Sequence, residues 1–190
     1  IETFKTPVAR FILNEDVKKM EVFSKAWMKD HSSVYISNKG GYQSSDLPLT
    51  LPIFNSLRQE AERCFNEFRK VFCYKAVFKI SNMWLNINSP KTYNFPHIHP
   101  FSCLSSAFYI KAPQKSGNLI FHNDYPIASF LKVKHITDSS WYNSTDWSFS
   151  IKENYFYVFP SWIKHSVESN QSNQDRISIS INAEERKEEK

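Results

Sequence analysis

Two histidines stand two residues apart in "NFPHIHPFSCLSSAFYI", the stretch over residues 94–110. His97 and His99 lie between Pro96 and Pro100, directly before a segment that we expect to form a strand. In an extended chain, side chains at positions i and i+2 point to the same face. The pattern therefore directs two imidazoles toward one metal ion, and the flanking prolines reduce the entropy that is lost when such ligands are fixed.

A third ligand is expected from a distant part of the chain. His165 in "FPSWIKHSV" follows another predicted strand and is our first choice. Asp124 in "FHNDYP" could supply a carboxylate in place of His99, because carboxylates also bind hard metal ions, but the sequence does not fix its position relative to His97. A single histidine in a β protein is commonly an ordinary polar residue. An HxH pair followed by a distal histidine favours a metal centre instead.

The segment "DRISISIN" is predicted to be a strand with one polar face. Isoleucines alternate there with the polar residues Arg176, Ser178, Ser180 and Asn182. The polar face could lie in solvent or point into a small barrel. In the second case Arg176 and Ser178 suit a carboxylate, because a guanidinium binds it through two parallel hydrogen bonds and a hydroxyl adds another.

These candidates need elements that bring them together, and the first part of the chain is predicted to be helical. Apolar residues recur at helical spacing over residues 15–29, with Asn14 as the expected N-cap, and again over residues 52–72. "GGYQSS", which begins at Gly40, is expected to be either a mobile loop over the site or a simple turn, because glycine permits backbone changes.

After residue 73 the chain consists of short segments rich in β-branched and aromatic residues, separated by turn signals such as "SPKTYN" and "PQKSGN". Seven or eight strands at this spacing predict a sandwich or barrel. We therefore predict a mainly β fold, a jelly roll with N-terminal helices. We expect one domain over 1–190, with a helical part at 1–72, a jelly-roll core at 73–183 and a charged tail at 184–190.

The composition limits the classes of protein that fit. The 190 residues carry a net charge of only +5 without a basic stripe, so a nucleic-acid-binding protein is not indicated. Three cysteines, an odd number without CxxC spacing, favour reduced thiols and a cytoplasmic protein, in the host cytoplasm if a virus encodes it. Neither a membrane span nor a signal peptide is expected. Exposed edge strands of a jelly roll leave a homodimer open.

The order of these motifs resembles the iron(II)- and 2-oxoglutarate-dependent oxygenases, whose fold is a double-stranded β-helix. More narrowly, "HIHPFSCLSSAFYIKAPQKSGNLIF", "FPSWIKHSV" and "DRISISIN" resemble a 2-oxoglutarate/Fe(II) oxygenase family that is common in marine bacteria and phages. "GGYQSSDL" is similar to that family's Gly-Trp-Gln-Ser segment, with Tyr42 in the tryptophan position. The similarity covers most of residues 40–182.

The resemblance implies a dioxygenase that uses iron(II), 2-oxoglutarate and dioxygen to hydroxylate a C–H bond. The sequence does not identify the substrate. His97 and His165 are implied as iron ligands. Arg176 is implied as the partner of the far carboxylate of 2-oxoglutarate, with Ser178 assisting and Tyr109 as a further contact.

One position departs from the pattern of the wider superfamily, which has a carboxylate two residues after the first histidine, whereas this chain has His99 there. A neutral imidazole there raises the net charge of the site by one and weakens its hold on iron(II), although three-histidine sites still bind iron or zinc. We expect His99 to be the third ligand, with Asp124 as the alternative.

Two other functions stay open from the residues alone. One is a cupin-like protein that binds a metal or another ligand without oxygenase activity. The other is a zinc-dependent lyase or isomerase with a three-histidine site. Neither needs an Arg-x-Ser pair after the distal histidine, so the placement of Arg176 and Ser178 favours the oxygenase.

Overall fold

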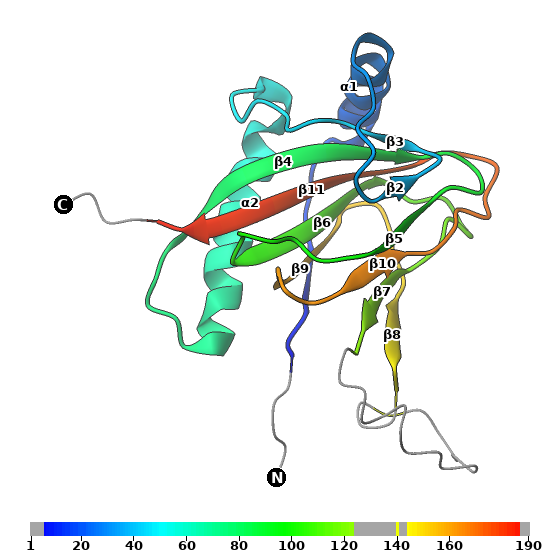
Figure 1. The fold of residues 1–190 in the computed structure, drawn as a ribbon. Helices are drawn as coiled ribbons and strands as arrows, with labels where there is room; N and C mark the ends of the chain where they lie inside the picture. The colour runs from blue at the N-terminus through cyan, green and yellow to red at the C-terminus, as the bar shows by residue number, and fades with distance from the viewer. Residues whose placement is uncertain (1–5, 124–139, 141–143, 187–190) are drawn as a thin grey trace, which may run out of the picture.

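Two antiparallel β-sheets face each other in the computed structural model, which describes residues 6–123, 140 and 144–186 (Figure 1). The strands of the six-stranded sheet are, in spatial order, β1 (Ala9–Ile12), β9 (Tyr155–Pro160), β6 (Leu104–Lys111), β11 (Arg176–Glu185), β4 (Phe78–Asn88) and β3 (Tyr42–Gln43). Those of the five-stranded sheet are β2 (Asn38–Lys39), β5 (Tyr93–His97), β10 (His165–Val167), β7 (Leu119–His122) and β8 (Asp146–Phe149). The predicted jelly-roll arrangement of two facing sheets is therefore present.

Both predicted helices are present, with shifted ends. The helices are α1 (Val17–Asp30) and α2 (Asn55–Phe68), the second flanked by the short 3₁₀ turns η1 (Pro52–Phe54) and η2 (Arg69–Phe72). Asn14 is not the N-cap of α1, as we had expected. Asp16 caps the helix, because its side chain accepts a hydrogen bond from the Lys19 N–H at 3.2 Å. Glu15 still belongs to the preceding extended segment, since its N–H donates to Asn154 Oδ1 at 2.9 Å.

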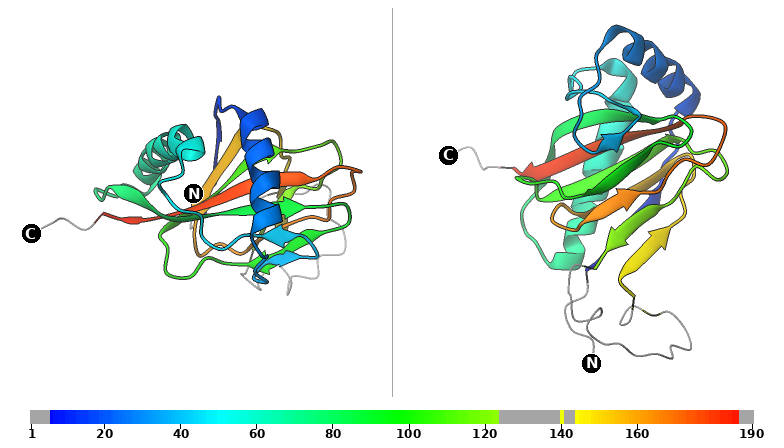
Figure 2. Two further views of the ribbon diagram at one scale, coloured as in Figure 1. Left: turned by 90° about the horizontal axis from the view of Figure 1, so that it is seen from above. Right: turned by 45° about the vertical axis from the view of Figure 1, so that its right-hand side comes forward.

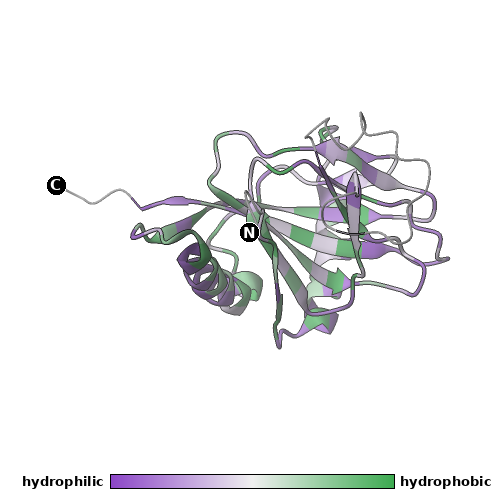
Figure 3. Ribbon diagram, turned by 90° about the horizontal axis from the view of Figure 1, so that it is seen from below, coloured by the Kyte–Doolittle hydropathy of each residue, from purple (hydrophilic) through white to green (hydrophobic). Residues whose placement is uncertain are grey.

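The main hydrophobic core lies between these helices and the outer face of the six-stranded sheet (Figure 2). Phe54, Leu57 and Phe65 of the helical region are fully buried there, and Ile179 of β11 meets them from the sheet side of the same core. Figure 3 shows that α2 turns its hydrophilic side to solvent. Each such side chain contributes about 1.5–3 kcal/mol on burial, so this layer accounts for much of the stability of the fold.

The inner face of the same sheet is polar. The three isoleucines of β11 are fully buried on the helix side, and Arg176, Ser178, Ser180 and Asn182 point the other way, between the sheets. Arg176 is only 1% exposed, so the polar face of this strand does not lie in solvent. Because side chains alternate along a strand, one sequence pattern supplies the outer core and the polar lining of the interior.

The expected division of the chain at residue 72 is less sharp in the structure. The helical part also supplies β1, β2 and β3, and β11 runs two residues into the expected tail, ending at Glu185. The two-residue strands β2 and β3 are too short to show a period of two, which explains why the sequence did not reveal them.

Gly40 and Gly41 mark the point where the chain crosses from one sheet to the other, because β2 pairs with β5 and β3 pairs with β4. Gly40 has φ +78°, and a Cβ on Gly41 would lie 2.5 Å from Ile87 O. Tyr42 and Gln43 are buried. The glycines therefore serve a packed crossing, and this segment is not the mobile loop that we considered.

Strand β5 contains an irregularity where it reaches the candidate metal site. His165 pairs with His97 and Val167 pairs with Asn94, so three steps along β5 match two along β10. This extra residue is a β-bulge, and Pro96, which has no N–H to donate, lies within it. Elsewhere, no helix among the described residues has the length and apolar character required to cross a membrane.

Candidate metal centre

Three histidines converge between the two sheets. His97 ends β5, His165 begins β10 as its cross-strand partner, and His99 lies two residues beyond β5. Their candidate ligand atoms all lie within 4.8 Å of one another. The ring centroids are 4.3 Å apart for His97 and His165, 4.9 Å for His99 and His165, and 5.2 Å for His97 and His99. This spacing suits three ligands of one metal ion.

Hydrogen bonds fix the tautomer of all three rings. His97 Nδ1 lies 2.8 Å from Phe95 O, and His165 Nδ1 lies 3.0 Å from Ile163 O. His99 Nδ1 lies 2.7 Å from Asn182 Oδ1. A carbonyl oxygen only accepts, so each Nδ1 carries the proton and each Nε2 presents a lone pair, the form that binds metals. The buried Nε2 of His99 has no hydrogen-bond partner among the described residues.

Burial keeps these imidazoles neutral. It lowers the pKa of His97, and it lowers the pKa of His165 well below its usual value, because the charged form loses its hydration. The pKa of His99 falls to about 4, through burial first and the neighbouring His97 second. Trp84 and Phe159 pack against His99 with ring centroids at 5.2 and 6.4 Å. At neutral pH the site therefore offers three uncharged nitrogen ligands.

Arg176 is a buried cation, and its guanidinium does not use all of its hydrogen-bond donors within the described residues. Its Nη1 donates to Ser116 O and, at 2.8 Å, to Glu168 O, while its buried Nη2 has no partner in the described part of the chain. Burial lowers its pKa to about 10, which still leaves the group charged at neutral pH. A carboxylate would supply such a buried guanidinium with both hydrogen bonds and a compensating charge.

Gly117 makes room for this guanidinium. It has φ +90°, and a Cβ there would lie 2.6 Å from Glu168 O and 3.0 Å from Arg176 Nη1. The glycine in "PQKSGN" is therefore required both by its backbone conformation and by the close approach of Arg176. The sequence showed the turn but not its second purpose.

Tyr109 and Ser178 lie next to Arg176 on the inner face of the sheet. They are cross-strand partners on β6 and β11, and both line a small cavity that His97 and His165 also line. The Tyr109 hydroxyl is buried without a partner among the described residues, and burial raises its pKa. This orphaned donor and the free Nη2 of Arg176 are the groups that a carboxylate needs, so the residues present fit a dicarboxylate beside a metal.

The cavity itself is narrow in this conformation. It measures about 20 Å³, which is room for roughly one water molecule. Leu119 and Val167 line it together with the polar residues. A dicarboxylate therefore has to displace these side chains when it binds.

Several residues that sequence reasoning missed or left open take defined places. Ser105 and Asn182 bond to His99, and Asn86 lines the cavity. Asn182 could have been found as the last polar residue of the alternating β11 pattern, whereas Ser105 carried no signal. Asp124 and His135 lie outside the described residues.

His122 does not join the cluster. Its Nδ1 bonds to Asp146 and its Nε2 lies 2.9 Å from Ser166 Oγ. Ser166 follows His165 on β10, so its side chain points to the opposite face of the five-stranded sheet. His122 therefore belongs to a polar network outside the barrel.

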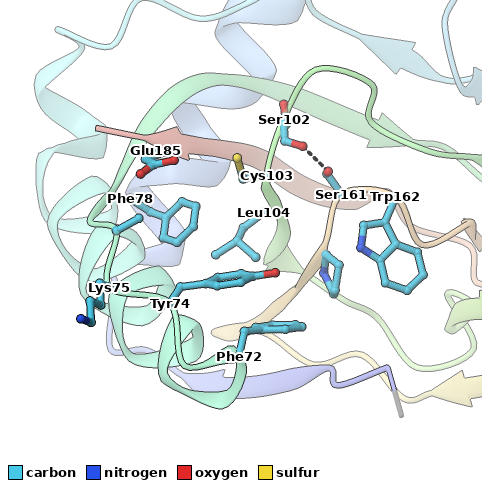
Figure 4. A pocket seen from close by; sticks show the side chains of 12 residues that line it. Phe72, Tyr74, Lys75, Phe78, Ser102, Cys103, Leu104, Ser161, Trp162 and Glu185 are labelled. Carbon is cyan, nitrogen blue, oxygen red and sulfur yellow. Dashed lines mark hydrogen bonds between the residues drawn. The ribbon is translucent and has the colours of Figure 1, made fainter. Parts of the chain in front are cut away.

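A larger groove lies on the other side of the six-stranded sheet. It measures about 460 Å³ and is lined by Tyr74, Phe78, Leu104 and Trp162, among others (Figure 4). Phe78 and Leu104 belong to the helix-side core, so the groove opens from that layer and not from the space between the sheets. His97, His165, Tyr109 and Ser178 line the smaller cavity instead.

Several solved structures share this fold. A Pseudomonas putida prolyl-4-hydroxylase is similar with a TM-score of 0.67 at 12% identity, over 96% of this chain and 94% of that one. HygX from Streptomyces hygroscopicus, solved with nickel and 2-oxoglutarate, gives 0.65 at 11%, over 95% and 83%. The viral collagen prolyl hydroxylase of Paramecium Bursaria Chlorella virus-1 gives 0.63 at 13%, over 98% and 97%. At these identities the likeness establishes the double-stranded β-helix fold.

No curated protein matches the chain in sequence. The family described as "Putative 2OG-Fe(II) oxygenase" matches residues 82–182, more than half of the chain. That range contains the three converging histidines and Arg176, and the cofactors of the family fit the unpartnered groups of the site. The chain belongs to the 2OG-Fe(II) oxygenases, oxidoreductases that depend on iron(II), 2-oxoglutarate and dioxygen.

Proposed function

We propose that His97, His99 and His165 hold iron(II) in this dioxygenase, and that Arg176, Ser178 and Tyr109 hold the far carboxylate of 2-oxoglutarate. The observation that carries the proposal is the convergence of three neutral histidines, each protonated at Nδ1, with candidate ligand atoms within 4.8 Å of one another. The unpartnered Nη2 of Arg176 supports the second half.

Charge balance also supports this assignment. Three neutral imidazoles leave the charge of iron(II) uncompensated, and Arg176 adds a further positive charge nearby. Among the described residues that line the cavity there is no carboxylate. A dianionic cosubstrate therefore meets an electropositive and largely dehydrated interior, where opposite charges attract more strongly than in water.

The residues around the metal then have separate roles. Iron(II) with 2-oxoglutarate supplies the activation of dioxygen, and we propose that the outcome is hydroxylation of a substrate C–H bond. Arg176 and Tyr109 orient the cosubstrate by binding the end that does not react. Trp84 and Phe159 pack against His99 and exclude water from that side of the site.

The test is an anaerobic titration of metal-free protein with iron(II) and then 2-oxoglutarate, followed by the visible charge-transfer band. We expect the band in the wild type and in His122→Ala, the matched control for a histidine outside the barrel. We expect it to be lost or weakened in His99→Ala and Arg176→Ala. A band that survives His99→Ala would move the third ligand to Asp124 or to water. A wild type without the band would contradict the proposed site.

A further inference from the structure

The three histidines differ in what holds their rings. His97 and His165 each donate Nδ1–H to a backbone carbonyl two residues earlier in the same segment. Backbone carbonyls are present whatever the side chain, so these two orientations need no dedicated residue. Among the described residues, no such carbonyl bonds to His99. The partners of its Nδ1 there are side chains from two other strands, Ser105 on β6 and Asn182 on β11.

The contacts around His99 Nδ1 form a closed triangle. Nδ1 lies 2.8 Å from Ser105 Oγ and 2.7 Å from Asn182 Oδ1, and the Ser105 hydroxyl donates to Asn182 Oδ1 at 2.8 Å. All three residues are buried, Ser105 completely. Since the amide oxygen cannot donate and the serine proton is directed at that oxygen, the proton between the ring and this pair belongs to Nδ1.

The other tautomer is costly at this position. A proton on Nε2 would point at the place where the metal would bind, and it would leave Nδ1 without a proton 2.7 Å from Asn182 Oδ1, an oxygen that cannot donate one. The Ser105 hydroxyl could then donate to Nδ1 only by giving up its bond to Asn182. Loss of a hydrogen bond by a buried polar group is unfavourable. The pair therefore selects, before any metal arrives, the form of His99 that can bind one.

We infer that Ser105 and Asn182 are positioning residues that set the tautomer of His99, and that they allow a histidine to serve where related enzymes have a carboxylate. A carboxylate needs no choice of tautomer, whereas an imidazole in its place does. Outer partners of metal-binding histidines of this kind typically change metal affinity 10–100-fold when they are removed. The tautomer part of the inference is independent of the proposed function, and the metal-affinity part rests on it.

The first test uses metal-free protein, so it does not depend on iron or on activity. Nitrogen chemical shifts of the histidine rings, read by long-range ¹H–¹⁵N NMR, distinguish Nδ1–H from Nε2–H. We expect Nδ1–H for His99 in the wild type and in Ser24→Ala, which removes another fully buried serine hydroxyl, bonded to Met20 O at 2.7 Å in α1. Asn182→Leu should populate both tautomers of His99. Ser105→Ala, which keeps the Asn182 oxygen, should shift the tautomer less, and both variants should leave His97 and His165 unchanged. Nε2–H in the wild type would overturn the inference.

The second test measures iron(II) affinity anaerobically in the same variants. Asn182→Leu should bind iron(II) roughly 10–100-fold more weakly than the wild type. Asn182→Asp should restore the affinity, because a carboxylate oxygen accepts the same Nδ1–H. Equal weakness of the aspartate and leucine variants would assign Asn182 a packing role and overturn the inference. If the wild type binds no iron(II) while the tautomer result holds, the proposed function fails and the tautomer assignment stands.

Discussion

The two faces of the six-stranded sheet are built from the same strands but carry opposite chemistry. The outer face is apolar and packs against α1 and α2. The inner face presents Arg176, Ser178 and Tyr109 to the space between the sheets. In β11 the two sets alternate residue by residue. Residues that stabilise the fold and residues that face the site therefore alternate along one strand. Substitutions on the outer face should change the free energy of unfolding, and substitutions on the inner face should change ligand binding.

The largest effect is expected from the inner face. Arg176→Met keeps the length of the side chain and removes its charge. Loss of one partner of a buried charged pair costs about 2–5 kcal/mol, so 2-oxoglutarate should bind roughly 30–5,000-fold more weakly. Calorimetric titration with 2-oxoglutarate in the presence of iron(II) measures this. Arg10→Met, which removes an exposed arginine that lies over Tyr155, is the control. Unchanged affinity in Arg176→Met would show that the cosubstrate is held elsewhere.

The outer face should give a large effect on folding alone. Ile179→Ala truncates a fully buried side chain, whose cross-strand partners in the sheet are Leu85 and Phe108. The free energy of unfolding should fall by about 2–5 kcal/mol, measured by urea denaturation. The affinity for iron(II) and 2-oxoglutarate of the folded variant should match the wild type. If Ile179→Ala lost cosubstrate binding while its free energy of unfolding stayed unchanged, the two faces would not have separate roles.

Acid should destabilise the metal-free protein through the buried histidines. Their pKa values are lowered in the folded state, so below about pH 6.5 the unfolded chain binds more protons and the free energy of unfolding falls with decreasing pH. For His99 the loss extends down to about pH 4 and is on the order of 3 kcal/mol. Urea denaturation at several pH values measures the slope.

Two variants test whether His99 contributes to this pH dependence of the free energy of unfolding. His99→Gln should flatten the slope between pH 6.5 and 4, because one buried group that protonates only on unfolding is gone. His31→Gln, which removes an exposed histidine, should leave it unchanged. The same slope in His99→Gln and the wild type would speak against a neutral, buried His99.

The smallest effect is expected outside the barrel, on the outer side of the five-stranded sheet. Asp146→Asn weakens the contact with His122, but the Asp146 side chain is 52% exposed and water screens the interaction. The free energy of unfolding should change by about 1 kcal/mol or less, and less at high salt. Iron(II) affinity should not change. A tenfold loss of affinity would instead connect this network to His165 through Ser166.

The elements with a clear period could be predicted from the sequence. The two helices and the alternating β11 follow from apolar residues at helical or two-residue spacing. The crossing at Gly40 and Gly41 could not be predicted, because β2 and β3 each have two residues and are defined only by partners distant in the sequence. Local patterns report which face of an element is apolar, but not which distant strand lies beside it.

The residues of the site also fall into those that could be predicted from the sequence and those that could not. His97, His99, His165 and Arg176 carry rare chemistry at recognisable spacing, and the structure brings them to one interior. Ser105 could not be predicted, because serine is common and its importance depends on which buried group it contacts. Ser116 could not be predicted either, because it contributes its backbone carbonyl to Arg176, which any residue would supply. Whether the polar face of β11 points to solvent or inward also depends on the closure of the second sheet, which no single strand encodes.

The bulge in β5 has a consequence for how such a protein can change in evolution. Because of the extra residue at Pro96, Asn94 and His97 face the same cavity although they are three positions apart. Substitutions in this segment alter one side chain each. A single-residue deletion between Asn94 and His97 would leave two steps of β5 opposite two steps of β10, a regular ladder in which both side chains still face the cavity. Lineages of this protein should therefore be able to lose the extra residue at Pro96 without turning His97 away from the site, at the cost of the local twist that the bulge adds.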